Sequence, residues 1–109
     1  MRVWDVPPGK LCRKHLLGEH SELHAVWTIL AEGRRGFSRH PETLRWKGRL
    51  RALYLRHEAL VKEMERRGYG HNSSLSVELA RGSAEQTSHV NIPEEQVEIL
   101  RRERCGCRV

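Results

Sequence analysis

Hydrophobic residues recur at helical spacing in the first third of the chain. Between Lys10 and Glu32, apolar side chains return every third or fourth position, which is the period of one buried helix face. The members of this face are Cys12, Leu16, Leu23, Val26, Trp27 and Leu30. Gly33 follows, and glycine is the residue that most often ends a helix. The pattern predicts a helix over residues 10–32.

A second segment with the same period begins at Pro41, which suits a first helical position. Its apolar face consists of Trp46, Leu50, Leu53, Tyr54, Leu60, Val61 and Met64. His57 lies near the centre of this face, where a histidine is more often a core residue than a ligand. Gly68 predicts the end, so we expect one helix over residues 41–67 that packs against the first.

The remaining segments are shorter. Pro7-Pro8-Gly9 is a rigid turn that ends a short N-terminal arm, and residues 70–92 are polar and predict a loop. Pro93 opens a third helix that reaches Arg104, and the tail after it is expected to be mobile. We therefore predict an all-α fold: a compact single-domain bundle of about three helices over residues 1–109, with an extended N-terminal arm.

Charge adds a class of partner to this picture. The 20 Lys and Arg residues exceed the 14 Asp and Glu residues, which gives a net charge of +6 and favours a polyanion such as nucleic acid. No apolar run approaches the roughly 20 residues that span a bilayer, and the first residues lack the apolar core of a signal peptide. We expect an intracellular, cytoplasmic monomer with no membrane partner.

Three polar residues line up along two turns of the first predicted helix. His15, Glu19 and Glu22 are spaced i, i+4 and i+7. Glu19 falls within the apolar face, where a carboxylate needs an arginine, a backbone donor or water as its partner. The row fits a solvated helix edge with one buried ion pair. It also fits a catalytic carboxylate supported by a histidine and a second acid.

A metal site is not expected. Two acids and a histidine can bind a metal, but no acidic cluster elsewhere completes a nuclease-type site. Cys105 and Cys107 form a Cys-x-Cys pair, whereas a structural zinc site needs four ligands, and Cys12 could contribute only from a distant part of the chain. We predict incidental thiols, no metal and no cofactor.

Aromatic and basic residues offer two further interpretations. The three tryptophans are more often core residues than base-stacking platforms; they are Trp4, Trp27 and Trp46. The loop with Arg34, Arg35, Phe37 and Arg39 is either solvated or holds phosphates and wedges a base step.

Taken together, four segments resemble the phage-type pyrimidine-dimer DNA glycosylase family over roughly the first 75 residues. The segments are Met1-Arg2-Val3-Trp4, residues 15–23, residues 36–41 and Arg66-Arg67-Gly68-Tyr69. Their order and spacing together carry the resemblance. It implies a bundle of about three helices and a bifunctional enzyme. The N-terminal amine attacks the anomeric carbon of the sugar and expels the base, and the resulting imine permits β-elimination, which nicks the strand.

The resemblance also implies residue roles. The essential glutamate of the family matches Glu22, a histidine near the sugar matches His15, and a basic residue near the scissile site matches Arg2. Counted back from Glu22, Met1 takes the place of the nucleophile, so we expect Met1 to be retained. Glu19 is expected to support this group. The lesion-gripping aromatic segment of the phage enzyme has no counterpart in residues 101–109.

The chemistry is consistent with these roles. An α-amine has a reference pKa of about 7.7–8.0, against about 10.4 for lysine, so a useful fraction is neutral and nucleophilic near neutral pH. Repulsion from the adjacent Arg2 favours the neutral amine further. A carboxylate at Glu22 can stabilise the cationic sugar and then move protons during imine formation and elimination.

Strand contacts are expected from basic residues near the first helix and loop. Family arginines that grip the strand are replaced by Ser21 and Ala25, and the predicted phosphate contacts are Lys10, Arg13, Lys14, Arg34, Arg35 and Arg39. The expected partner is double-stranded DNA with a damaged base or an abasic site.

The predicted function is a DNA repair glycosylase with β-elimination lyase activity, acting on a damaged base and foremost on a pyrimidine dimer. Two alternatives stay open. One is the same lyase chemistry on another lesion or on a bare abasic site. The other is a non-enzymatic basic helical module that binds nucleic acid or a protein and needs neither Glu22 nor a free N-terminus.

Overall fold

The computed structural model describes residues 2–33, 39–70 and 73–109. Its elements in chain order are η1 (Pro8–Lys10), α1 (Arg13–Glu32), α2 (Pro41–Leu44), α3 (Leu50–Arg66), η2 (Val77–Leu79) and α4 (Pro93–Glu103). The described ranges contain no strand, only an isolated antiparallel bridge between Arg49 and Gly82. The prediction of an all-α bundle with about three helices is confirmed, since three of the four α-helices are long. None of the helices in these ranges combines the length and apolar character that a membrane span requires.

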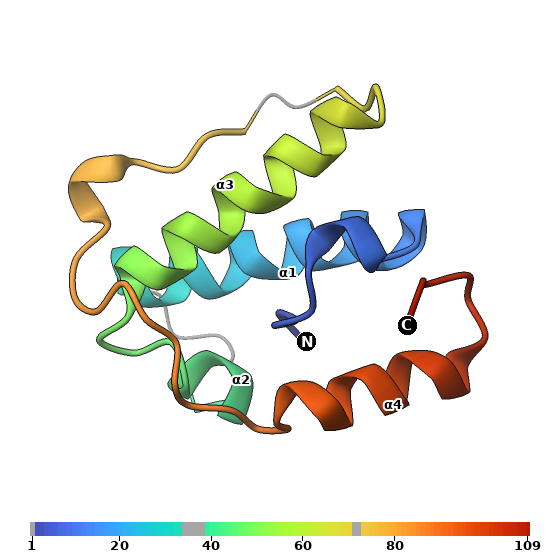
Figure 1. Ribbon diagram of the computed structural model, residues 1–109. Helices are drawn as coiled ribbons and strands as arrows, with labels where there is room; N and C mark the ends of the chain where they lie inside the picture. Colours follow the sequence, from blue (N-terminus) through green and yellow to red (C-terminus); the bar gives the residue numbers. More distant parts are fainter. Residues whose placement is uncertain (1, 34–38, 71–72) are drawn as a thin grey trace.

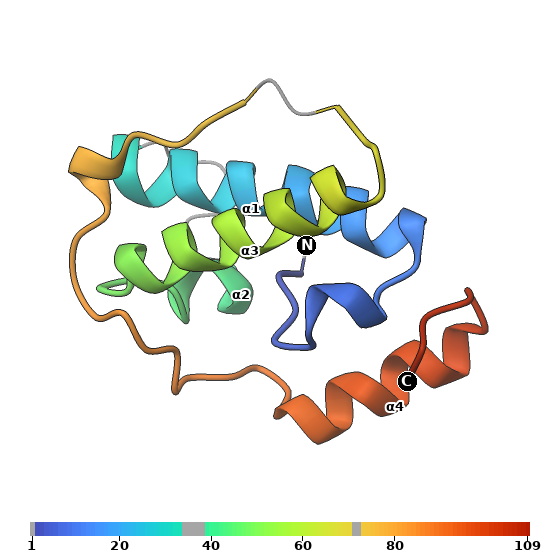
Figure 2. The same cartoon turned by 45° about the horizontal axis from the view of Figure 1, so that its top comes forward.

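The N-terminal segment runs through the middle of the molecule. Helices α1 and α3 lie side by side, and α4 lies on the other side of the N-terminal segment from this pair (Figures 1 and 2). The predicted N-terminal arm is therefore extended, but it is a central layer of the fold and not a free end.

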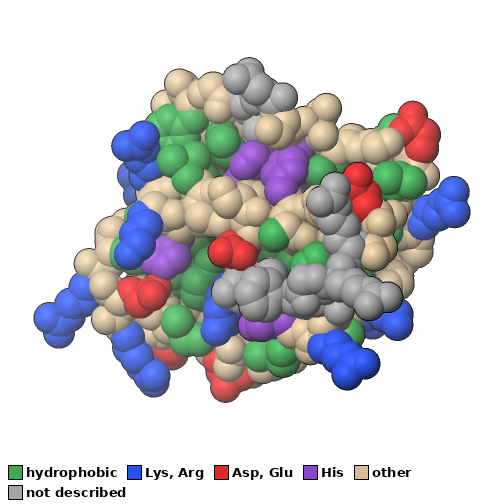
Figure 3. All heavy atoms as spheres, turned by 180° about the vertical axis from the view of Figure 1, so that it is seen from behind, with side chains coloured by type: hydrophobic (Ala, Val, Ile, Leu, Met, Phe, Trp, Pro, Cys, Tyr) green, Lys and Arg blue, Asp and Glu red, His purple; other side chains and the backbone are tan. Residues whose placement is uncertain are grey.

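On the face seen in Figure 3, Lys and Arg side chains stand mainly around the rim.

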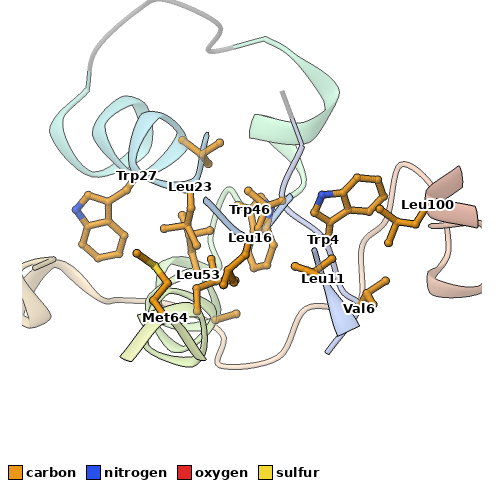
Figure 4. Packing of buried hydrophobic residues seen from close by; sticks show 14 residues of the cluster. Trp4, Val6, Leu11, Leu16, Leu23, Trp27, Trp46, Leu53, Met64 and Leu100 are labelled. Carbon is orange, nitrogen blue, oxygen red and sulfur yellow. The ribbon is translucent and has the colours of Figure 1, made fainter. Parts of the chain in front are cut away.

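The core joins these layers. Its buried apolar residues are Val3, Trp4, Val6, Leu11, Leu16, Leu23, Val26, Trp27, Trp46, Ala52, Leu53, Leu60, Met64 and Leu100. Figure 4 shows one part of this cluster between α1 and α3, and a second part in which Trp4 lies next to Leu100 of α4. The prediction that all three tryptophans belong to the core is confirmed, as each is at most 6% exposed.

Helix ends follow the local signals in the sequence. Gly33 ends α1 in the left-handed region with φ +70°, and Gly68 follows α3 with φ +82°. Pro93 opens α4. The Glu95 side chain accepts a hydrogen bond from the Ile92 N–H, one turn earlier, at 3.1 Å. The first helix begins at Arg13 and not at Lys10, because η1 precedes it.

The prediction of one helix over residues 41–67 is wrong. The chain forms α2, turns over residues 45–49 and then begins α3. Gly48 has φ +76°, and its carbonyl accepts a hydrogen bond from the Ser83 N–H at 3.0 Å. Gly82 approaches so closely that a Cβ there would lie 2.2 Å from the Gly48 oxygen. A contact with a distant segment thus interrupts a continuous helical pattern.

The expectation of a mobile tail is also not met. The Arg108 N–H donates to the Lys10 carbonyl at 2.7 Å, and Cys107 and Val109 pack against the core. In Figure 1 the chain folds back after α4 toward the segment that precedes α1. The end of the chain is therefore attached to the beginning of the first helix.

We predict that Leu53→Ala lowers the free energy of unfolding by about 2–5 kcal/mol, because Leu53 is fully buried between α1 and α3 and its loss leaves a cavity. Urea unfolding measures the change. Leu55→Ala on the same helix is the control, since Leu55 is 44% exposed and its loss should change stability by less than about 0.5 kcal/mol. Equal effects of the two substitutions would contradict the packing described here.

Candidate active site

Two buried carboxylates from different helices hold the N-terminal segment. The Val3 N–H donates to Oε1 of Glu42 in α2 at 3.0 Å. The next backbone N–H, that of Trp4, faces the carboxylate of Glu19 in α1 and favours its charged form. Consecutive backbone donors are thus held from two directions, which fixes the path of the chain at its beginning.

Glu19 has the partners that its place in the apolar face requires. It is 2% exposed, and Arg56 of α3 donates to it twice, from Nε at 2.6 Å and from Nη2 at 2.9 Å. The expectation that this carboxylate needs an arginine or a backbone donor is confirmed, and it has both. Burial raises the pKa of Glu19, and the Arg56 charge opposes that shift.

A second buried ion pair was not foreseen. Arg45 is 5% exposed and donates from Nε to Glu42 at 2.8 Å and from Nη2 to the Val3 carbonyl at 2.5 Å. Its Nη2 also lies 3.1 Å from the Asp5 carboxylate, which accepts from Gln96 of α4 at 2.7 Å. Arg45 is not a member of the apolar face that the sequence predicts for this segment. The i, i+3 spacing of Glu42 and Arg45, directly before a core tryptophan, is the signal that sequence reasoning missed.

Glu22 lies one turn beyond Glu19 on α1 and is half-buried. Arg2 is also half-buried; its Nη1 donates to Asn91 Oδ1 at 3.0 Å, and its guanidinium lies 4.9 Å from the centre of the Trp4 ring. Met1, the predicted nucleophile, lies outside the described residues. The described part of this region therefore supplies a half-buried carboxylate and a cation held beside the N-terminal segment.

His15 faces the end of α4. Its Nε2 lies 2.7 Å from the Glu103 carboxylate, and its Nδ1 lies 3.1 Å from Cys12 Sγ and 3.7 Å from Cys107 Sγ. Its ring also packs edge-on against Trp4, with 5.7 Å between centroids. His15, Glu19 and Glu22 therefore have different surroundings. His15 lies among the cysteine thiols, Glu19 belongs to a buried ion pair, and Glu22 is half-buried at the edge of the helix.

Two groups among the described residues bring three or more metal-ligating side chains together. The first consists of Cys12, His15, Cys105 and Cys107. The second consists of His20, His24 and His57. Sequence reasoning missed both, because each joins residues that are distant in the chain.

The histidine group lies between α1 and α3. His24 Nε2 and His57 Nε2 are 3.2 Å apart, and His57 Nδ1 lies 3.0 Å from the Glu58 carboxylate. The expectation that His57 is a core residue is confirmed, since it is 1% exposed. Histidine side chains reach the surface together in the upper part of Figure 3.

The predicted phosphate contacts that the structure describes are exposed. They are Lys10, Arg13, Lys14 and Arg39; Arg34 and Arg35 lie outside the described residues. Near the start of α1 a hollow of about 410 Å³ is lined in part by four arginines, which are Arg13, Arg66, Arg67 and Arg108. Hydrogen bonds from Arg66 and Arg67 lower the pKa of Glu63 to about 2, so this carboxylate is charged and offsets part of the positive charge.

We predict that Arg56→Met destabilises the fold by about 3–5 kcal/mol at neutral pH, because it leaves the Glu19 carboxylate buried without its cation. The pKa of Glu19, already raised from 4.5 by burial, then rises further. A carboxyl whose pKa is higher in the folded state contributes its full stability below the unfolded value and loses it as pH rises through the folded value. The deficit of the variant should therefore shrink as the pH falls from about 7.5 toward about 5.

Denaturant unfolding of both proteins across this pH range measures the effect. Arg101→Met is the matched control, because Arg101 pairs with Glu98 in an exposed ion pair and should change stability by less than about 1 kcal/mol. A deficit of Arg56→Met that grows toward acid pH would contradict the account of Glu19.

Comparison with known proteins identifies the family to which this chain belongs. The sequence model of the pyrimidine dimer DNA glycosylase family matches residues 1–77. No curated protein and no solved structure matches the chain. The matched region contains the N-terminal segment, α1, α2 and α3, with all four residues of the two buried ion pairs. The resemblance in the sequence is thereby confirmed, and the chain belongs to the pyrimidine dimer DNA glycosylase family of DNA repair enzymes.

Proposed function

We propose that this protein is a DNA glycosylase with lyase activity that removes a damaged base, foremost a pyrimidine dimer, from double-stranded DNA. The α-amine of Met1 is the nucleophile and Glu22 is the catalytic carboxylate. The observation that carries the proposal is that Trp4 lies beside α1, with its N–H facing the Glu19 carboxylate. This contact lies three residues before Glu22, which is a rise of about 4.5 Å along the helix.

The place of Trp4 along α1 supports this assignment. The Trp4 ring lies against His15, and the Trp4 N–H faces Glu19, one turn further along α1. Trp4 therefore lies beside the two turns of α1 that precede Glu22. Glu22 belongs to the next turn.

The proposed reaction uses an amine and a carboxylate in sequence. The neutral amine forms a bond to the anomeric carbon of the sugar as the glycosidic bond to the base breaks. Loss of a proton from the amine and opening of the sugar ring give the imine, and β-elimination then cleaves the strand. Glu22 stabilises the positive charge that develops on the sugar and moves protons in the later steps.

The surrounding residues position these two groups. Glu19 with Arg56, and Glu42 with Arg45, act as positioning residues because they hold the backbone of Trp4 and Val3. Arg2, held beside Trp4 and Asn91, keeps a positive charge near the start of the chain, which favours the neutral amine.

His15 has a different environment. Both of its ring nitrogens lie within 3.7 Å of side chains of Cys12, Glu103 or Cys107. These contacts favour a structural role over the role at the sugar that the resemblance implies, so we leave His15 out of the chemistry.

DNA contacts are proposed along α1 and at its N-terminal end. Gly18, Ser21 and Ala25 are small and exposed on this helix, so a DNA strand can approach the helix closely there. None of these three residues carries a positive charge that could bind a phosphate. Phosphate contacts then come from Lys10, Arg13 and Lys14 near the start of α1 and from Arg39 after it, together with Arg34 and Arg35, which lie outside the described residues.

We predict that borohydride traps the protein covalently on a duplex with an abasic site, because reduction of an imine gives a stable amine. Glu22→Gln should keep DNA affinity but lower strand cleavage by about 10²–10⁴-fold, since it removes the group that moves protons. Gel assays of trapping and cleavage, with binding measured separately, test both parts.

Glu32→Gln is the matched control, because Glu32 is an exposed acid on the same helix and should leave cleavage unchanged. Cleavage by Glu22→Gln at the wild-type rate would remove Glu22 from the mechanism. Binding without trapping by the wild-type protein would favour the non-enzymatic nucleic-acid-binding module. Duplexes with a pyrimidine dimer, an oxidised base or an abasic site, compared in one panel, identify the lesion.

A second prediction concerns the amine itself. Acetylation of the N-terminus should abolish trapping and cleavage, because an amide nitrogen cannot form an imine. The unfolding temperature and DNA affinity of the acetylated protein serve as controls and should stay close to those of the free protein. Full activity after acetylation would show that a lysine is the nucleophile.

A further inference from the structure

The start of α1 and the tail after α4 bring four metal-ligating atoms to one place. Cys12 and His15 come from the first turn of α1 and its N-cap, and Cys105 and Cys107 come from the tail. All four ligand atoms lie within 4.8 Å of one another. We propose that these residues form a structural zinc site, which replaces the expectation from sequence of incidental thiols and no metal.

The distances between ligand atoms fit a tetrahedral site. Zinc binds Cys at about 2.3 Å and His at about 2.0–2.1 Å, so neighbouring ligand atoms in a tetrahedron lie about 3.5–3.8 Å apart. Here Cys12 Sγ lies 3.1 Å from His15 Nδ1, Cys107 Sγ lies 3.7 Å from it, and the sulfurs of Cys105 and Cys107 are 3.4 Å apart. Small movements would centre an ion among them.

The outer contacts of the ligands also fit a zinc site. Glu103 lies 2.7 Å from His15 Nε2, and a carboxylate there fixes the imidazole with Nδ1 toward the metal. The Cys12 N–H donates to Cys107 Sγ at 3.0 Å, a contact that stabilises a thiolate. These two interactions orient a histidine nitrogen and a sulfur toward the same point.

Charge around the cluster is complementary. A zinc ion with three thiolates and a neutral histidine has a net charge of −1. Cys12 and Cys105 also line the hollow that contains Arg13, Arg66, Arg67 and Arg108. The positive charge of these arginines balances the net negative charge of such a site. All three cysteines are free, so none is already committed to a disulfide.

The ligand set assigns the role of the ion. Four protein ligands leave no open position for water or substrate, which is the arrangement of structural zinc sites. The ion would link the tail to the first turn of α1 and hold α4, whose Leu100 packs beside Trp4, against the N-terminal segment. This role does not depend on the proposed function.

Metal analysis of the full chain, purified under reducing conditions with zinc, tests the site. We expect one zinc per chain in the wild-type protein and its loss in the double variant Cys105→Ser, Cys107→Ser. Because the histidine group could bind a metal instead, His24→Gln is the matched control and should keep its zinc. Chelation should lower the unfolding temperature of the wild-type protein by roughly 10 °C or more.

Cobalt substitution of the wild-type protein gives a second measurement that does not depend on the folding of a variant. Tetrahedral thiolate ligation should produce intense visible bands and a sulfur-to-cobalt charge-transfer band. Absence of bound metal, zinc retained without Cys105 and Cys107, loss of zinc in His24→Gln, or a spectrum without thiolate bands would each overturn the proposal. Borohydride trapping is scored separately, so failure of the zinc site and failure of the proposed function are distinguishable.

Discussion

The rest of the structure depends on two buried ion pairs that hold the N-terminal segment. Glu19 pairs with Arg56, and Glu42 pairs with Arg45. Glu42 also accepts a hydrogen bond from the Val3 N–H, and Glu19 faces the Trp4 N–H. Burying two charges is costly, and apolar residues of similar volume often stabilise a fold as well. Apolar side chains, however, offer no acceptor to backbone N–H groups. The buried charges therefore make sense as a device that fixes the backbone of Val3 and Trp4.

Helix α1 connects this device to the other parts of the molecule. One face of the helix contributes Leu16, Leu23 and Trp27 to the core and carries the buried Glu19, and Glu22 lies half-buried one turn further on. Its first turn contributes to the thiol cluster. A displacement of α1 would consequently change the core, the anchoring of the N-terminal segment and the attachment of the tail together, so a rigid α1 serves all three.

The sequence predicts the features that depend on neighbouring residues. Gly33 and Gly68 mark helix ends because left-handed backbone favours glycine, and the spacing of Leu16 and Leu23 marks a buried face. The break before α3 was missed because it depends on the contact between Gly48 and Gly82, 34 positions apart by their numbers, and no local pattern reports such a contact.

In the candidate site, too, the sequence predicts what depends on neighbouring residues and misses what depends on contacts between distant residues. The composition of the apolar face shows that Glu19 needs a partner, but Arg56 lies 37 residues away and only the fold brings it there. His15, Glu19 and Glu22 line up along two turns of α1, yet helical spacing says only which side chains are neighbours on the helix and not which partner meets each of them. The tail meets His15, and the N-terminal segment meets Glu19. A family resemblance over residues 1–77 cannot register the first of these contacts, because the tail lies outside the matched region. The structural role that we propose for His15 therefore rests on contacts with a part of the chain that the family match does not cover.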